Sequence, residues 1–69
     1  MPLTMAKIGE SNMIKKIGGR EDTKKFLENL GFVTGGKVTV ISEISGNMIL
    51  KVKDSRVALS KDMTNKILI

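Results

Sequence analysis

Short apolar runs separated by turn residues fill most of this chain, and several of them alternate apolar with polar positions. Alternation with a period of two gives a strand one buried face. Met48, Leu50 and Val52 show this pattern most clearly. The segments predicted to be strands are residues 12–17, 37–44, 48–53, 56–59 and 66–69.

Two of these strands have irregular spacing. In the first, the apolar anchors Ile14 and Ile17 are three residues apart, which strict alternation does not allow. We therefore expect a bulge or a strand end near Lys16. In the second, the apolar positions change phase at Ile41, which predicts a bend or bulge partway along that strand.

One helix is predicted, over residues 20–30. The side chains expected on its apolar face follow the spacing i, i+3, i+4 and i+7: Thr23, Phe26, Leu27 and Leu30. Gly31 comes directly after the last of them, where a left-handed residue commonly ends a helix. The helix is thus expected to stop at Leu30.

The order of these elements predicts the fold class. Small β domains protect their strand edges by closing into barrels. The helix falls between the first and second strands, whereas in an OB-fold it usually falls between the third and fourth. We expect a mainly β chain, with residues 1–69 forming a single SH3-like barrel of about five strands and one short helix. Leu3 and Ile8 are expected to reach its core.

The loop after the helix holds two adjacent apolar residues, Phe32 and Val33, between Gly31 and Gly35. Apolar loop residues either plug the core or form a contact surface for another protein. Adjacent side chains do not easily point the same way, so one of the two is expected to face solvent or a partner. The sequence leaves open which one.

Composition argues against catalysis. The chain has no histidine and no cysteine, which removes the commonest general base and every thiolate metal site. The seven acidic residues form no recognisable catalytic or calcium-binding pattern. The glycine pairs at 18–19 and 35–36 lack the Lys-Ser/Thr of a phosphate-binding P-loop. We therefore expect neither an enzyme nor a bound cofactor.

The net charge of +5 raises the question of an anionic partner. Lys51 and Lys53 share one strand face, Arg56 is expected opposite them, and Lys15 and Lys16 could extend the stripe. This basic surface suggests nucleic-acid binding as an alternative function. Single-strand binders need aromatic platforms, however, and the chain has no Trp or Tyr. No nucleic-acid partner is therefore expected.

The sequence also bears on location. No apolar run approaches the roughly 20 residues of a membrane span. The first residues lack the apolar core of a signal peptide. A small chain without cysteine fits a reducing interior. A cytoplasmic location without a membrane span is expected.

The loop and the strand after it resemble a known family signature. Leu30-Gly31-Phe32-Val33-Thr34-Gly35-Gly36-Lys37-Val38 is similar to the Leu-Gly-hydrophobic-x-Pro-Gly-x-x-Val motif of FeoA, the small cytosolic ferrous iron transport protein A. Val57-Ala58-Leu59-Ser60 resembles the late strand of that family, and residues 67–69 resemble its closing strand. Thr34 stands where the family usually has proline, but Gly35 still supports a type II turn.

This resemblance implies an SH3-like barrel and a non-catalytic adapter or regulator of bacterial ferrous iron uptake. The implied partner is the membrane permease FeoB, whose cytosolic part carries a G domain. The residues predicted to contact it are Leu30, Gly31, Phe32, Val33, Thr34, Gly35 and Lys37.

Three other hypotheses remain at this point. The first is a basic barrel that binds nucleic acid through Lys51, Lys53 and Arg56. The second is a stand-alone SH3-like domain related to those of iron-dependent repressors. The third is weak, transient Fe²⁺ binding by carboxylates. No residue pattern specifies an oligomeric state.

Overall fold

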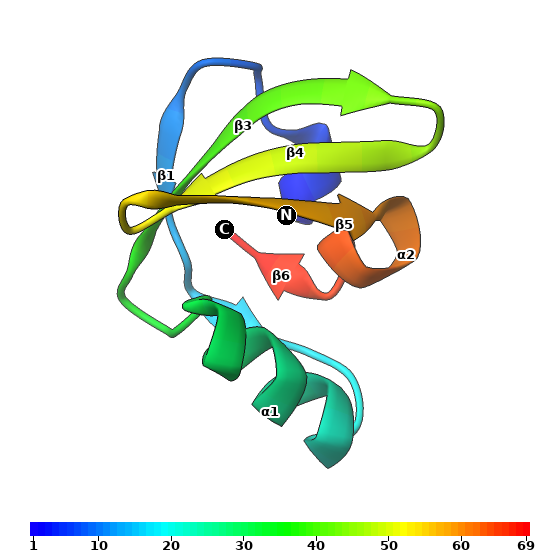
Figure 1. Ribbon diagram of the computed structural model, residues 1–69. Helices are drawn as coiled ribbons and strands as arrows, with labels where there is room; N and C mark the ends of the chain where they lie inside the picture. The colour runs from blue at the N-terminus through cyan, green and yellow to red at the C-terminus, as the bar shows by residue number, and fades with distance from the viewer.

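The strands form two antiparallel sheets in the computed structural model, which describes residues 1–69 (Figure 1). The larger sheet has the order β1-β3-β4-β5, with β1 at Ser11–Met13, β3 at Lys37–Ile44, β4 at Asn47–Val52 and β5 at Ser55–Ser60. The smaller sheet pairs β2 (Lys16–Ile17) with β6 (Ile67–Leu68). Three helical segments complete the fold: η1 (Leu3–Met5), α1 (Glu21–Leu30) and α2 (Lys61–Thr64).

The expected first strand is in fact two strands in different sheets. β1 ends at Met13 and pairs with β3, whereas β2 begins at Lys16 and pairs with β6. The break lets Ile14 and Ile17 both enter the core, which a regular strand could not do. The chain therefore has six strands rather than about five, and α1 lies between β2 and β3. The SH3-like arrangement is present, with two sheets instead of one closed ladder.

The β3–β4–β5 meander owes its tight turns to local backbone geometry. Ile44 pairs with Asn47, so Ser45 and Gly46 alone make the first turn, with φ values of 47° and 82°. Positive φ at both positions is what a type I′ hairpin requires. The predicted irregularity at Ile41 is confirmed by a register shift between Val40 and Ser42. Such a bulge increases the twist of the strand.

The core lies between the two sheets and is closed at one end by α1. Figure 1 shows α1 at the opposite end of the molecule from the β3–β4 hairpin. The buried apolar side chains come from nearly every element: Leu3, Ile14, Ile17, Leu27, Phe32, Val38, Val40, Met48, Leu50, Val52, Leu59 and Ile67. No helix of the structure has the length and apolar character needed to cross a membrane.

Two residues expected in the core are not there. Phe26 is 50% exposed, because α1 buries only a narrow strip centred on Leu27. Ile8 is 63% exposed, because it lies in the turn between η1 and β1. Both errors come from judging burial by local spacing, which does not show how much of a helix or lead-in segment the rest of the chain covers.

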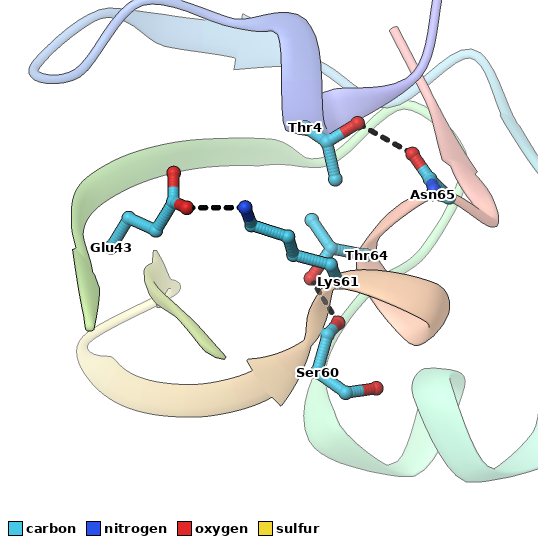
Figure 2. A network of polar contacts seen from close by, with 6 residues as sticks. All are labelled: Thr4, Glu43, Ser60, Lys61, Thr64 and Asn65. Atoms are coloured by element: carbon cyan, nitrogen blue, oxygen red, sulfur yellow. Dashed lines mark hydrogen bonds and ion pairs between the residues drawn. The ribbon is translucent and has the colours of Figure 1, made fainter. Parts of the chain in front are cut away.

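The short helix α2 is held by its own cap. The Ser60 side-chain oxygen accepts a hydrogen bond from the Met63 backbone N–H at 3.2 Å, as expected of an N-cap. The Thr64 hydroxyl donates to the Ser60 carbonyl at 2.8 Å (Figure 2). Thr64 is the only fully buried polar side chain, so this bond satisfies a group that would otherwise be costly to bury.

Polar contacts join α2 to more distant parts of the chain (Figure 2). Lys61 forms an ion pair with Glu43 near the end of β3. The Thr4 hydroxyl donates to the side-chain oxygen of Asn65, which ties η1 to the end of α2. These contacts fasten α2 between the larger sheet and the N-terminal segment.

Replacing Thr64 with valine should lower the free energy of unfolding by about 1 kcal/mol. The substitution keeps the side-chain volume but removes the hydrogen bond to Ser60. Thr39→Val is the matched control, because Thr39 lies on a strand and makes no side-chain hydrogen bond; its effect should stay within about 0.5 kcal/mol. Urea denaturation measures both. Equal losses in the two variants would contradict a special role for the Thr64 hydroxyl.

Candidate functional site

The loop predicted to bind a partner begins with a precise helix stop. The Gly31 N–H donates to the Glu28 carbonyl at 2.9 Å, and the Phe32 N–H donates to the Leu27 carbonyl at 3.0 Å. This pair of bonds is a Schellman motif, with Gly31 in the left-handed region at φ 109°. The expected role of Gly31 is confirmed, and the motif turns the chain back toward the core.

The two apolar loop residues point in different directions. Phe32 is fully buried, whereas Val33 is 38% exposed. The Phe32 side chain is thus a core plug and is not available at the surface, which removes it from the expected contact set. Leu30 is half-buried against the core. The question left open by the sequence is answered in favour of Val33 as the outward-facing residue.

Val33 is the first residue of a tight turn that continues through Thr34 and Gly35 to Gly36. The Gly36 N–H donates to the Val33 carbonyl at 2.9 Å, and Gly35 in the third position has φ 87°. This is the geometry of the expected type II turn, with Thr34 in the position where proline is common. We call residues 33–36 the glycine corner.

Hydrogen bonds to Ile14 fix the glycine corner in place. The Gly35 N–H donates to the Ile14 carbonyl at 2.7 Å, and the Ile14 N–H donates to the Gly36 carbonyl at 2.8 Å. Ile14 itself is buried between the two sheets. Val33, Thr34 and Gly35 are therefore exposed on a rigid support, which lowers the ordering cost of binding a partner.

Several basic side chains lie on the outer face of the larger sheet next to this corner. Thr39 lies opposite Lys51, and Lys51 lies opposite Arg56, so the three form one row across β3, β4 and β5. Arg56 lies opposite Lys51 as expected, whereas Lys53 lies in the turn after β4 and not on the predicted strand. Lys15 and Lys16 do not extend this basic row. Lys16 belongs to β2 in the smaller sheet, and Lys15 directly precedes it.

The outer face is hollowed between these strands. A shallow depression of about 300 Å³ is lined by Ser11, Lys37, Thr39, Lys51 and Lys53. We call it the basic hollow. Its members come from β1, β3 and the β4–β5 hairpin, and none of them is acidic. Sequence reasoning missed Ser11 and Thr39, because only the strand register places them beside Lys51.

The glycine corner and the basic hollow adjoin one another. Lys37 directly follows the corner and also lines the hollow. On the other side, a β-carbon built at Gly31 would lie 3.7 Å from Cδ of Lys53. One surface thus presents an exposed apolar residue, Val33, beside a group of uncompensated positive charges.

The structure shows no preformed cluster for metal binding. It brings together no group of three or more acidic, histidine or cysteine side chains. The two ion pairs, Lys24–Glu21 and Lys61–Glu43, engage their acidic groups on α1 and at the end of β3.

Comparison with known proteins identifies the family. The family model described as the FeoA domain matches residues 1–69. A Methanocaldococcus jannaschii protein with the provisional name Fe(2+) transport protein A is 32% identical over 68 residues, which span 99% of this chain and 83% of that protein. The chain belongs to the FeoA family. This family serves ferrous iron transport.

Solved structures of FeoA share the fold. The zinc complex of Stenotrophomonas maltophilia FeoA, described as a prokaryotic SH3 domain protein, superposes with a TM-score of 0.85 at 19% identity, covering 99% of this chain and 87% of that one. A manganese-dependent transcriptional repressor also superposes, with a TM-score of 0.85 at 14% identity, over 97% of this chain and 39% of its own. The SH3-like fold is confirmed, and it is shared with part of a repressor.

Gly31→Ala should destabilise this FeoA chain by roughly 1–2 kcal/mol, because alanine is strained at φ 109°. Gly18→Ala is the control: Gly18 has an ordinary φ and its added β-carbon would make only a normal contact with the Lys66 carbonyl at 3.5 Å. That variant should be neutral or slightly more stable. Thermal unfolding of both variants measures the difference, and a neutral Gly31→Ala would contradict the assigned motif.

Lys51→Glu should stabilise the protein by about 0.2–1 kcal/mol. Lys51 and Arg56 face each other with like charges, and the substitution turns them into an opposite-charge pair. Arg56→Glu should act in the same direction. In the double variant the gain from this pair should disappear, since two acidic side chains then face each other. Urea unfolding at low salt gives the three values. Additive stabilisation in the double variant would show that the two side chains do not interact.

Proposed function

We propose that this FeoA chain is a non-catalytic adapter of ferrous iron uptake that regulates the permease FeoB by direct protein contact. The single observation that carries the proposal is the exposed Val33 on the hydrogen-bonded glycine corner, beside the basic hollow. The family's link to Fe²⁺ transport supports the choice of pathway. The proposed location is the cytoplasm, where the G domain of FeoB is expected.

The chemistry of this surface defines what the partner should present. Val33 and the Thr34 methyl group fit a small apolar depression. Lys37 and Lys53 on the same side fit acidic residues around that depression, which would steer the encounter and set its orientation. The contact set predicted from sequence thus narrows to Val33, Thr34, Gly35 and Lys37, because Phe32 is enclosed by the core.

The adapter role is favoured over catalysis by the composition of the surface. It offers aliphatic, hydroxyl and ammonium groups without histidine, cysteine or a paired carboxylate that could move a proton. Weak binding of Fe²⁺ as cargo by scattered carboxylates is not needed for this role. The likeness to a repressor, at 14% identity, shows a shared fold and gives no support to a role in gene regulation.

The test is an NMR titration of this protein with the cytosolic domain of FeoB. Signals of residues 33–37 should shift, and Val33→Asp should weaken binding by about tenfold or more, because it places a charge in an apolar contact. Phe32→Ala is unsuitable, since losing a buried phenylalanine costs about 3–5 kcal/mol of stability.

Ile44→Asp is the matched control for Val33→Asp. Ile44 is also exposed, at 59%, but lies at the far end of β3 from Lys37. This variant should bind the FeoB domain as the parent does, and circular dichroism should show that both variants are folded. Unmoved signals at residues 33–37 with saturating partner, or equal weakening by both variants, would overturn the proposed surface.

A further inference from the structure

The basic hollow gathers positive charge that the protein itself does not neutralise. Lys37, Lys51 and Lys53 line it, and none of them takes part in either ion pair of the structure. No carboxylate lines the depression. Charges of one sign around a concave surface reinforce one another and concentrate counter-ions there.

The strand register holds these charges together at a cost to stability. Lys51 lies directly opposite Arg56, and like charges in that position repel. Lys53 follows β4 in the turn to β5, and its side chain lines the hollow together with Lys37 and Lys51. Binding of a multiply charged anion in the hollow would offset the repulsion among these basic side chains.

The size and lining of the hollow point to a compact ligand. Its volume of about 300 Å³ is at the lower end of small-molecule sites, which run from about 300 to 1,000 Å³. The hydroxyl groups of Ser11 and Thr39 lie among the lysines and can donate hydrogen bonds. Lysine ammonium groups bind phosphate as point charges and need no bidentate geometry.

Extended nucleic acid fits this site less well. Single-strand binding relies on bases stacking on aromatic side chains. The chain has two phenylalanines, of which Phe32 is buried in the core and Phe26 lies on α1; neither lines the hollow. The lining offers positive charge for a phosphate group but no aromatic platform for a base.

We propose that the basic hollow is a binding site for a polyphosphate group, a diphosphate or a triphosphate. The ammonium groups of Lys37, Lys51 and Lys53 surround its oxygens, and Ser11 and Thr39 donate hydrogen bonds from the strands. The site needs no protein partner, although it shares Lys37 and Lys53 with the surface proposed to contact FeoB.

The experiment is a titration of the isotope-labelled protein with inorganic triphosphate, followed by NMR. Saturable shifts are expected at residues 11, 37, 39, 51 and 53, with an affinity that falls as salt rises. Lys51→Gln should weaken binding by about fivefold, the size expected for one solvent-exposed charge contact. The exposed position of Lys51 and the repulsion from Arg56 mean that this variant should fold at least as well as the parent.

Lys25→Gln provides the matched control, because it removes the same charge from the exposed surface of α1. It should leave triphosphate affinity unchanged. Equal weakening by Lys25→Gln, or shifts spread over all lysines without saturation, would show only general charge attraction and would overturn the site.

Two further binding experiments identify which kind of molecule carries the phosphate group. Vesicles of phosphatidylcholine with phosphatidylinositol bisphosphate test a lipid headgroup, and displacement by triphosphate would support the same site with a lipid source. Binding of a short single-stranded DNA without any binding of triphosphate would overturn the proposal in favour of nucleic acid. Because FeoB is absent from these measurements, their failure leaves the Val33 test intact, and the reverse also holds.

Discussion

The backbone hydrogen bonds at Ile14 and Lys15 are the constraint on which the rest of the fold depends. Ile14 pairs in both directions with the glycine corner, through Gly35 and Gly36, while the Lys15 N–H donates to the Leu68 carbonyl at 2.8 Å. This short segment therefore connects the larger sheet, the smaller sheet and the loop after α1. Burial of Ile14 makes its two bonds to the glycine corner difficult to replace with water.

The candidate contact surface follows from that constraint. Once the corner is fixed to Ile14, the Schellman turn at Gly31 has one direction in which to send the next side chain, and Phe32 enters the core. Val33 is left outside on a support that does not need to be ordered when a partner arrives. Stability and recognition thus use adjacent residues of one loop without competing for the same side chain.

The outer face of the larger sheet shows the opposite relation between stability and binding. Strand register places basic side chains against one another in the row that contains Lys51 and Arg56. A surface designed only for stability would alternate the signs of its charges across the strands. The repulsion between Lys51 and Arg56 favours binding of an anionic group at this face, whether that group is on a protein or on a small molecule.

Local chemistry made much of the fold predictable from sequence. The helix stop at Gly31, the turn at Gly35, the irregularity at Ile41 and the alternation around Leu50 each depend on a few neighbouring residues, and each was found as expected. The FeoA motif is equally local, which is why the family could be identified from the chain. Burial failed as a prediction at Phe26 and Ile8, because exposure depends on segments far away along the chain.

The sequence by itself determined where the chain turns, which segments become strands and which family it belongs to. Only the tertiary structure decided that Phe32 faces the core and Val33 faces outward, because that choice depends on how the loop bonds to Ile14. Only the tertiary structure, likewise, joined Lys37 to Lys51 and Lys53 and added two hydroxyl groups. Strand register pairs residues that are distant in the chain, and no local pattern contains that information.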